Sequence, residues 1–485
     1  MINNKENLTC EYLVIGSGAG GSTACKYLTD KGKDVILIEE GKHFKVNEFK
    51  GSMAKSLLNV WRNAGVTPII SKSNFGFGEG RCLGGGTYVN GGLMWRTPKI
   101  ILDLWNKILN TKKFDSKNLD KYFFEIENIL EMNDYNMKDY TENKDSIKLT
   151  EIGKKFKINV VDVPKSINST KIENKLLLGS PAQTENSVLQ KFIYPSIKKG
   201  LKLITDCKVD KLVSSNNKII SVEATLNKKK IYIYPKKIIL ACGATQTPML
   251  IKKSFGNNFL ISEMSVHLNF RIGVKFNEKM FAARGIMFTK QIQEYLDDGV
   301  LIMPTSFNKS SFFSSIAKMN NLEISKISQD INFYSNFVIQ VQSKNKVNIK
   351  NLNNNMILTY KLNLDDLNKI IYYFETFCGY LFDTGAEEIL LPLKKNFRIT
   401  KNINWKKFIQ ENVLENNLEM VSVHGTSSAK MGNNRTNKEI FDTDGQSFDY
   451  NNLYCLDSSV LPTSTIESPQ ATIMAVARHI LQEIS

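Results

Sequence analysis

The sequence predicts an α/β protein in which a domain with parallel strands is interrupted by a second, α+β unit built on an antiparallel sheet. Three observations predict this fold. Residues 11–41 contain a strand, a glycine turn, a helix and a second strand, which together are the building block of a parallel sheet. Residues 255–420 contain alternating apolar and polar runs, as antiparallel strands with one buried face do. Short apolar runs on either side of that region resume the first pattern.

The first unit begins with an apolar run at residues 12–15, which the glycine-rich turn at 16–21 follows directly. Small residues predict a helix over 21–30, a Lys-Gly-Lys turn ends it, and a second apolar strand is expected at 35–38. The order and spacing are those of a Rossmann-like β-α-β unit with the motif G-x-G-x-x-G at its first turn.

Each glycine of this motif has a predicted physical task. Gly16 permits the tight turn, Gly18 lets a pyrophosphate approach the backbone, and Gly21 lets the helix pack closely on the strand. The helix N-terminus presents free N–H groups to the phosphates. Glu39 ends the second strand, where a carboxylate can bind the ribose hydroxyls. The stretch therefore predicts dinucleotide binding, and by itself it leaves FAD and NAD open.

Composition describes an ordinary folded protein with several units. A length of 485 residues suggests two or three units, and no apolar run approaches the length that spans a membrane. The N-terminus lacks the basic and apolar regions of a secretory signal. The seven cysteines are widely spaced with no C-x-x-C, so we expect neither a disulfide framework nor a metal site, and a cytoplasmic location.

The formal charge of +16 raises the question of an anionic partner. The lysines are scattered, often beside asparagine, without a long basic run or interleaved aromatic residues. This pattern favours a solvated lysine-rich surface and no nucleic-acid partner. An anionic substrate or peripheral contact with an acidic membrane surface stays open.

A second glycine-rich stretch covers residues 76–93. So many glycines suit a backbone that lies against a flat ligand or its phosphates. The apolar residues Leu83, Val89 and Leu93 within it argue against a mobile surface loop.

The rest of the first half predicts helices and short strands. Helices are expected at residues 47–64, 100–107 and 119–132. Short strands are expected at residues 201–204, 209–213, 219–224 and 231–233. A separate buried strand at 238–244 ends in a glycine turn before a helix that begins at residue 247, as if the chain returned to the nucleotide-binding sheet.

Residues 255–420 have a different character. Strands are expected at residues 270–276, 285–289, 300–303, 334–342, 347–349 and 356–360. A polar stretch at 306–330 interrupts them, and a long helix is expected at 364–379. An antiparallel sheet inserted into a nucleotide-binding domain usually forms a substrate chamber, which is an expectation from architecture alone.

The last segment contains the strongest signals of chemistry. A loop of small residues at 424–432 carries one histidine, and a strand at 453–456 delivers Asp457 at its end. Ser468 followed by proline predicts the N-cap of a helix over 470–483.

These segments together resemble the glucose–methanol–choline (GMC) family of FAD-dependent oxidoreductases. The resemblance covers the nucleotide-binding turn, residues 81–96 and 243–254, and the chain from His424 to its end. It implies an FAD-binding Rossmann-like domain at residues 1–100, 190–254 and 421–485. An inserted α+β substrate domain, built on an antiparallel sheet, is expected at residues 101–189 and 255–420.

The resemblance also implies a set of cofactor-binding residues. The glycine-rich stretch would lie along the pyrophosphate and isoalloxazine, Val209 would meet the adenine, and the amide of Gln470 would face the flavin pyrimidine ring. The implied set is Gly16, Ser17, Gly18, Gly21, Glu39, Gly84, Gly85, Thr87, Asn90, Gly91, Val209, Asp457, Ser458 and Gln470.

The implied reaction is oxidation of an alcohol to a carbonyl compound, with hydride transfer to flavin N5 and His424 as general base. His424 lies where the family places its catalytic histidine. Of the other three histidines, His43 follows the second Rossmann strand, His267 lies at the head of the inserted unit, and His479 lies inside the last helix. Elimination therefore also favours His424.

The sequence departs from the family pattern at three places. Ser468 stands where members usually carry histidine or asparagine, and two serines at 427–428 replace the usual Gly-Thr. Val89 stands where some members carry the histidine that binds FAD covalently, so noncovalent FAD is expected. Ser468 is predicted either to cap the last helix only or also to bond the substrate oxygen beside His424.

Two other functions are weighed against alcohol oxidation. A GMC-like flavoprotein can also perform non-oxidative chemistry, as a lyase or a photoenzyme does. A basic nucleic-acid-binding or membrane-binding protein with a structural flavin is the third hypothesis. The small-molecule alcohol and the electron acceptor, whether oxygen, a quinone or another compound, stay open.

Overall fold

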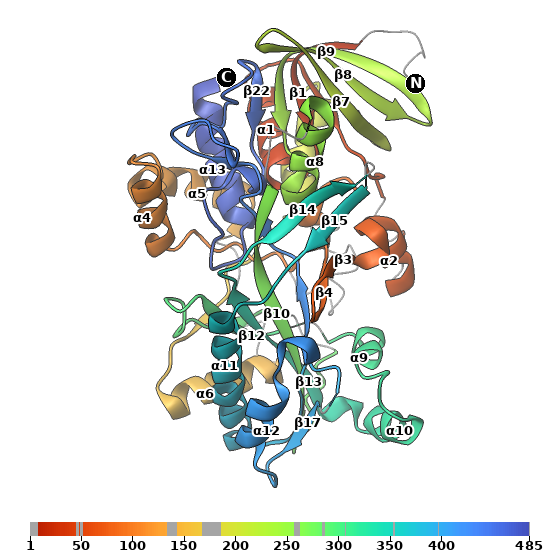
Figure 1. Ribbon diagram of the computed structural model, residues 1–485, viewed down its shortest axis with the longest axis vertical. Coiled ribbons are helices and arrows are strands. Elements are labelled where there is room, and N and C mark those ends of the chain that lie inside the picture. Colours follow the sequence, from red (N-terminus) through yellow and green to blue (C-terminus); the bar gives the residue numbers. More distant parts are fainter. Residues whose placement is uncertain are drawn as a thin grey trace.

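The computed structural model describes residues 8–44, 48, 52–132, 143–166, 186–256, 262–283, 287–305, 307–352, 355–395 and 397–484. Two sheets organise these residues (Figure 1). The smaller sheet lies at the upper end of the view, near both ends of the chain, and the larger sheet occupies the middle and lower parts. The predicted combination of a Rossmann-like unit with a second, largely antiparallel unit is confirmed.

The smaller sheet has seven strands in the order β6-β2-β1-β9-β8-β7, with β22 also paired to β9. Five of them are parallel: β1 (Leu8–Ile15), β2 (Val35–Ile38), β6 (Lys202–Ile204), β9 (Lys229–Leu240) and β22 (Leu453–Cys455). The antiparallel pair β7 (Cys207–Ser215) and β8 (Lys218–Leu226) completes it. The chain therefore does return to the nucleotide-binding sheet, as the sequence predicts.

β9 is one strand where the sequence predicts two, at 231–233 and 238–244. Pro235 lies between the two predicted runs, and proline removes a ladder donor. In the structure β1 pairs with β9 from Ile233 to Leu240, whereas on its other edge β8 pairs only as far as Ile233 and β22 begins at Ile238. Pro235 lies in the gap between these two partners, so its missing N–H does not interrupt the strand.

Helices cover the smaller sheet. α1 (Ala19–Asp30) and α13 (Gln470–Ile484) pack against each other, and α5 (Ser116–Ile129) packs on α13. The predicted helices at 100–107 and 247 onward are confirmed as α4 (Lys99–Ile108) and α8 (Gly243–Phe255). α4 and α5, which the proposed limits place in the substrate domain, contribute to the apolar core of the smaller sheet.

The larger sheet has thirteen strands, and β10 (Ser262–Phe276) is its fifteen-residue spine (Figure 1). Its main path is β14-β15-β3-β4-β18-β10-β13-β12-β11-β5. The bounds are β3 (Thr67–Ile70), β4 (Asn74–Phe77), β5 (Val160–Asp162), β11 (Lys290–Ile292), β12 (Val300–Pro304), β13 (Tyr334–Gln342), β14 (Val347–Leu352), β15 (Asn355–Thr359), β16 (Ala386–Leu390), β17 (Arg398–Thr400), β18 (Glu419–Ser422) and β19 (Gly425–Thr426). A separate pair is formed by β20 (Lys430–Met431) and β21 (Glu439–Phe441).

Helices also cover the larger sheet. α11 (Leu364–Asp383) confirms the predicted long helix and buries an aromatic face in the second core. α6 (Lys144–Phe156) and α12 (Trp405–Asn412) pack near it. The polar stretch at 306–330 contains α9 (Lys309–Ser315) and α10 (Asn321–Gln329), and Asn320 caps the second of these.

Three local predictions are wrong. The predicted strand at 285–289 begins only at Lys290, because Phe288 has a φ of 57°, which no strand accommodates; residues 285 and 286 lie outside the described part. The predicted helix at 47–64 is shorter: α2 spans Met53–Val60, and the extended backbone of Trp61 ends it; residues 47 and 49–51 lie outside the described part. β3 and β4 were missed, since Pro68 and Gly76 within them are typical of turns.

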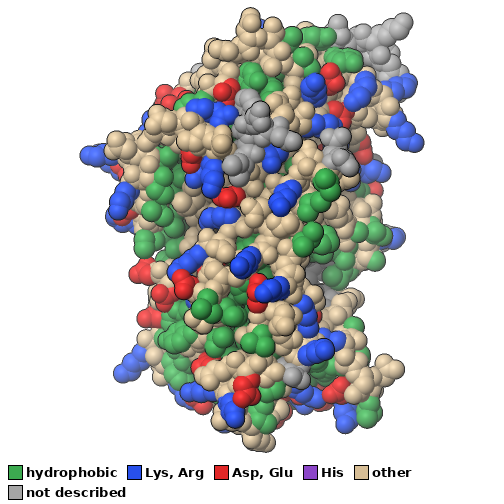
Figure 2. Space-filling view, viewed as in Figure 1, with side chains coloured by type: hydrophobic (Ala, Val, Ile, Leu, Met, Phe, Trp, Pro, Cys, Tyr) green, Lys and Arg blue, Asp and Glu red, His purple; other side chains and the backbone are tan. Residues whose placement is uncertain are grey.

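The distribution of charged side chains on the surface and the state of the cysteines agree with the expectations from composition. Figure 2 shows Lys and Arg side chains scattered over the visible face among acidic and apolar ones. All seven cysteines are free. No helix within the described ranges is long and apolar enough to cross a membrane. The described residues also place no cluster of three His, Cys, Asp or Glu side chains to hold a metal ion.

Candidate active site

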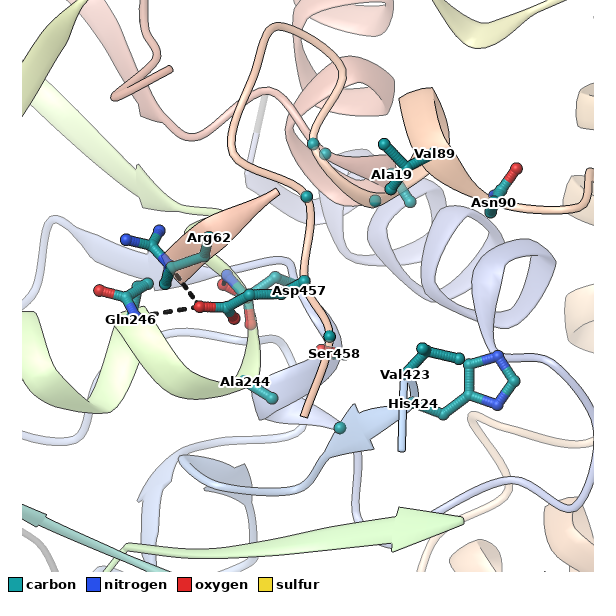
Figure 3. Close-up of a pocket in the computed structure, with 18 of the residues that line it drawn as sticks. Ala19, Arg62, Val89, Asn90, Ala244, Gln246, Val423, His424, Asp457 and Ser458 are labelled. Atoms are coloured by element: carbon teal, nitrogen blue, oxygen red, sulfur yellow. Dashed lines mark hydrogen bonds and ion pairs between the residues drawn. The ribbon is translucent and has the colours of Figure 1, made fainter. Parts of the chain in front are cut away.

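A cavity of about 670 Å³ lies where the two sheets meet. Its wall contains the first glycine turn, the second glycine-rich stretch, the end of β2 and the chain at 457–458, together with strands of the larger sheet. In Figure 3, Arg62 and Gln246 lie at one end, Asp457 and Ser458 lie in the middle, and His424 lies at the other end. Most of the sequence-predicted residues, from both halves of the chain, therefore meet around one space; Gly21 and Gly84 lie behind its wall.

The glycines of the first turn have different surroundings. Gly16 has a φ of 99°, and a Cβ there would lie 2.3 Å from the carbonyl oxygen of Ala241. A Cβ on Gly21 would lie 1.9 Å from the oxygen of Gly16, which confirms the predicted close packing of helix on strand. A Cβ on Gly18 would meet no atom within 4 Å. Gly18 therefore faces the cavity, and its missing side chain leaves room for a ligand.

Ser17 and Glu39 connect this turn to its neighbours. The Ser17 hydroxyl donates to Glu39 Oε2 at 2.6 Å and accepts from the N–H of Gly84 at 2.8 Å. Glu39 also accepts from the N–H groups of Ser17 and Gly41. Burial raises the pKa of Glu39, and these hydrogen bonds oppose the rise. Both residues line the cavity, and the ribose contact of Glu39 stays a prediction.

The second glycine-rich stretch forms the short helix α3 (Gly86–Val89) and contacts the first turn. Gly84 and Gly85 have positive φ, and a Cβ on Gly85 would lie 3.2 Å from the Cα of Gly18. The Thr87 hydroxyl caps this turn by donating to the carbonyl of Gly84 at 2.8 Å. Two backbone segments thus approach each other closely beside the cavity, an arrangement that suits a phosphate between N–H groups.

Asn90 and Gln470 meet at the flavin end of the predicted site. The Asn90 side-chain amide donates to Gln470 Oε1, and Asn90 Oδ1 accepts from the N–H of Gly92 at 3.0 Å. Gln470 is the first residue of α13 and is buried. Together with Gly91 and Val89 they line the cavity. The structure therefore brings together the residues that the resemblance assigns to the flavin ring.

Val209 and Asp457 lie elsewhere along the wall. Val209 lines the cavity beside Cys207 and Lys208, as expected for an adenine contact. The Asp457 carboxylate accepts hydrogen bonds from the N–H groups of Gly243 and Ser459, from the hydroxyls of Thr247 and Ser459, and from the thiol of Cys455. Asp457 therefore ties the end of β22 to the start of α8, and Ser458 beside it lines the cavity.

An ion cluster at one end of the cavity was missed by sequence reasoning. Arg62 bonds both oxygens of Glu40 and forms an ion pair with Glu79, to which Gln246 also donates (Figure 3). Burial alone would lower the pKa of Arg62, but the carboxylates of Glu79 and Glu40 raise it. No motif surrounds these residues, because their pairing depends on the folded chain.

The opposite end contains two histidines. His424 Nδ1 lies 3.1 Å from His267 Nδ1, and His424 Nε2 lies 3.4 Å from the Ser468 hydroxyl. Burial lowers the pKa of His424 to about 3, with the nearby His267 adding to the effect. Burial likewise lowers the pKa of His267 to about 4. Both rings are therefore neutral near pH 7. The elimination among the four histidines in the sequence set His267 aside, whereas the structure places its ring next to that of His424.

The loop that carries Ser468 is held by amide side chains. Glu467 is 1% exposed and accepts from the amides of Gln291 and Gln293. Burial raises its pKa to about 7. The amide of Gln340 donates to the carbonyl of Ile466 at 2.8 Å. No pattern in the sequence indicates these glutamines: Gln291 lies in β11, Gln293 follows that strand directly, and Gln340 lies in β13.

The serine pair in the histidine loop has a structural explanation. Ser427 has a φ of 64°, a conformation that glycine adopts more easily. The N–H groups of Ser427 and Ala429 donate to the carbonyls of Ser458 and Ser459, and the Ser428 hydroxyl bonds the carbonyl of Ala244. These bonds hold the loop in place although serine replaces the more permissive residue.

Comparison with known proteins decides the family. The N-terminal model of the GMC oxidoreductases matches residues 10–269, and their C-terminal model matches residues 341–477. The chain belongs to the GMC oxidoreductase family. The protein is therefore an oxidoreductase, and FAD is its cofactor, as the sequence predicts.

Similar proteins extend over nearly the whole chain. An uncharacterised GMC-type oxidoreductase of Sinorhizobium fredii is 22% identical over 99% of this chain and 95% of its own length. The long-chain-alcohol oxidase FAO3 of Arabidopsis thaliana is 22% identical over 99% of this chain and 68% of its own length.

Two solved structures share the fold. Pyridoxine 4-oxidase from Mesorbium loti superposes with a TM-score of 0.74 at 12% identity, covering 98% of this chain and 99% of its own. Formate oxidase from Aspergillus oryzae RIB40 superposes with a TM-score of 0.75 at 11% identity, covering 99% of this chain and 98% of its own. These likenesses confirm the GMC fold with its FAD-binding Rossmann-like unit.

Proposed function

We propose that this GMC oxidoreductase oxidises an alcohol to a carbonyl compound, with His424 as the general base. The observation that carries the proposal is the position of His424 Nε2, which lies on the cavity wall, 3.4 Å from the Ser468 hydroxyl and held in a neutral ring. A neutral imidazole nitrogen facing the substrate space is what removal of a hydroxyl proton requires.

The cavity residues fit FAD. Gly18 leaves open space where a pyrophosphate would lie, and α1 begins with Gly18 at its N-cap and no side-chain cap. Its first N–H groups and dipole thus favour an anion. When bound, FAD supplies the acceptor for the hydride. Val89 at the wall provides no nucleophile for a covalent link, so we propose noncovalent binding.

The chain's own residues then have separate tasks. The glycine turns hold the phosphates, and the linked amides of Asn90 and Gln470 provide polar contacts near the ring. His424 Nε2 takes the proton from the hydroxyl oxygen as the hydride leaves the carbon that bears this hydroxyl, so that a carbonyl group remains. The Ser468 hydroxyl, which lies 3.4 Å from His424 Nε2, bonds the same substrate oxygen. The substrate chamber beyond them is lined by Asn269 of β10 and by Gln340 of β13, which pairs with it.

The names of similar proteins support a hydroxyl-bearing donor. Long-chain-alcohol oxidase and pyridoxine 4-oxidase are named for alcohols, whereas formate oxidase is named for another donor. The alternative function is non-oxidative chemistry, as in a lyase or photoenzyme. Anaerobic mixing with a panel of alcohols, sterols and sugars separates the two. Bleaching of the visible flavin absorbance with formation of the carbonyl product is expected; product formed without flavin reduction would contradict the proposal.

A second readout of the same experiment identifies the electron acceptor. After anaerobic reduction, oxygen and a quinone are added separately, and the return of the flavin absorbance is timed. Rapid return with oxygen identifies an oxidase, and rapid return with the quinone alone identifies a dehydrogenase.

A further inference from the structure

Four groups form a chain of hydrogen bonds behind the cavity. The carbonyl oxygen of Thr465 lies 2.5 Å from His267 Nε2, and His267 Nδ1 lies 3.1 Å from His424 Nδ1. His424 Nε2 then lies 3.4 Å from the Ser468 hydroxyl at the cavity. His267 is 1% exposed, so water does not substitute for any of its partners.

The order of donors in this chain follows from the carbonyl. A carbonyl oxygen only accepts, so His267 Nε2 carries the hydrogen. A neutral imidazole has one N–H, which leaves His267 Nδ1 as an acceptor. His424 Nδ1 is the atom facing it and must therefore donate. In a neutral His424 ring, the lone pair is then on Nε2, the nitrogen that faces the cavity.

We infer that His267 is a positioning residue, which selects the Nδ1–H tautomer of His424 and so leaves Nε2 free to act as the base. The base role rests on the proposed function, whereas the tautomer rests on the hydrogen bonds alone. In the opposite tautomer, two bare Nδ1 atoms would face each other at 3.1 Å in a buried site, and neither lone pair would have a donor.

Backbone pairing holds the two rings at this distance. His267 belongs to β10, where it pairs with Gln342 of β13. The preceding residue, Val266, pairs with Gly425, the residue that follows His424. β10, which carries His267, and β19, which begins directly after His424, are thus hydrogen-bonded neighbours, and the rings meet nearly perpendicular, at 87°. A fixed spacing of this kind is what makes a side chain effective in choosing a tautomer.

The selected tautomer also has a use after proton transfer. When Nε2 of His424 takes the substrate proton, the O–H bond breaks and an N–H bond forms on the same ring. The Nδ1–H of that ring keeps its bond to His267, whose lone pair stabilises the positive charge. No buried carboxylate is needed for this purpose.

The first test reads the tautomer directly in the FAD-loaded protein. The chain has four histidines, so ¹⁵N-histidine labelling gives few ring signals, and the signals of His424 are those that disappear in His424→Ala. We expect a protonated Nδ1 and an unprotonated Nε2 near pH 7 in the wild type. A protonated Nε2 would overturn the inference whether or not an alcohol is ever oxidised.

The second test uses two substitutions at one position. His267→Asn places an amide oxygen near the lost Nδ1 and should preserve the His424 tautomer, whereas His267→Phe should give a mixture. With an identified alcohol, His267→Phe should slow flavin reduction by at least about tenfold, within the range of a general-base contribution, with little change in substrate affinity. His267→Asn should recover most of that rate.

Controls separate positioning from folding. His43→Asn removes an exposed histidine that bonds Tyr194 and should change neither the tautomer nor the rate. Flavin content and melting temperature are measured for every variant. Equal tautomers and equal reduction rates in wild type and His267→Phe would refute the inference, while a His267→Phe protein without flavin leaves the wild-type spectrum to decide.

Discussion

Two parts of the cavity wall are built in opposite ways: the glycine end, formed by the turns around Gly18 and Gly85, and the histidine end. At the glycine end, backbone lines the wall, and a Cβ added at Gly18 would enter open space. At the histidine end, side chains from β10, the loop after β18 and the loop before α13 meet at hydrogen-bond distance. Adding atoms should therefore damage the first end, whereas removing atoms should damage the second. Binding and reaction can be lost separately.

The largest effect is expected at the glycine end. Gly18→Val fills the space for the pyrophosphate, so the purified protein should contain almost no flavin, as measured by its visible absorbance. Gly379→Ala, on α11, is the control, because its Cβ would make only an ordinary contact with Trp405 of α12. A yellow Gly18→Val protein with a full complement of flavin would remove this glycine from the binding site.

The next largest effect belongs to the histidine end. His424→Ala should keep its flavin, which acid precipitation should release as free FAD, yet reduce that flavin roughly a hundredfold to ten-thousandfold more slowly. The loss should be partial, since substrate positioning survives. Stopped-flow reduction under anaerobic conditions measures it. Unchanged reduction kinetics would mean that the base is elsewhere.

The third prediction concerns pH. A histidine with an ordinary pKa near 6.5 would be mostly protonated at pH 5, and its rate as a base would fall about thirtyfold. Burial lowers the pKa of His424 to about 3, so the ring stays neutral and its contribution should stay level from pH 8 to pH 5. The rate of flavin reduction measured across that range should show no acid limb from this group.

A nearby group needs separating in that measurement. Glu467, whose pKa burial raises to about 7, titrates within the same range. The pH profile is therefore repeated with Glu467→Gln. An acid limb near pH 6.5 that persists in Glu467→Gln would show that His424 titrates normally, contrary to the expectation.

The smallest effect is expected at Ser468. α13 begins at Gln470, and the Ser468 hydroxyl lies 3.4 Å from His424 Nε2. A hydrogen bond of about 1 kcal/mol corresponds to roughly fivefold in rate, so Ser468→Ala should slow flavin reduction by about that factor. Ser468→Asn should preserve or raise the rate if the larger side chain fits. Equal rates in wild type and Ser468→Ala would leave this serine a helix cap.

The same contrast explains what the sequence could predict. The glycine turn, α1 and β2 are local in sequence, and each depends on spacing within about thirty residues, so their positions followed from pattern alone. The start of α13 was likewise signalled by Ser468 and the proline after it. These elements define the cofactor end of the cavity.

The rest depends on distant pairing. His267 and His424 are 157 positions apart and meet because β10 and β19 pair. The continuity of β9 through Pro235 depends on where its partners end, and the ion cluster of Arg62 depends on residues from two other segments. The periodicity of a short stretch of sequence contains no information on contacts between distant residues. The histidine pair and the ion cluster of Arg62 could therefore be found only from the structure.

β10 has a consequence for how new specificities can arise. Successive residues of a strand alternate between its faces, so His267, Asn269 and Arg271 share one face, and the last two line the chamber. The strand therefore holds His267 at a fixed spacing from two residues on the wall of the proposed substrate chamber. Exchanges at 269 and 271 can change which molecules enter, while the spacing of the reacting groups remains untouched.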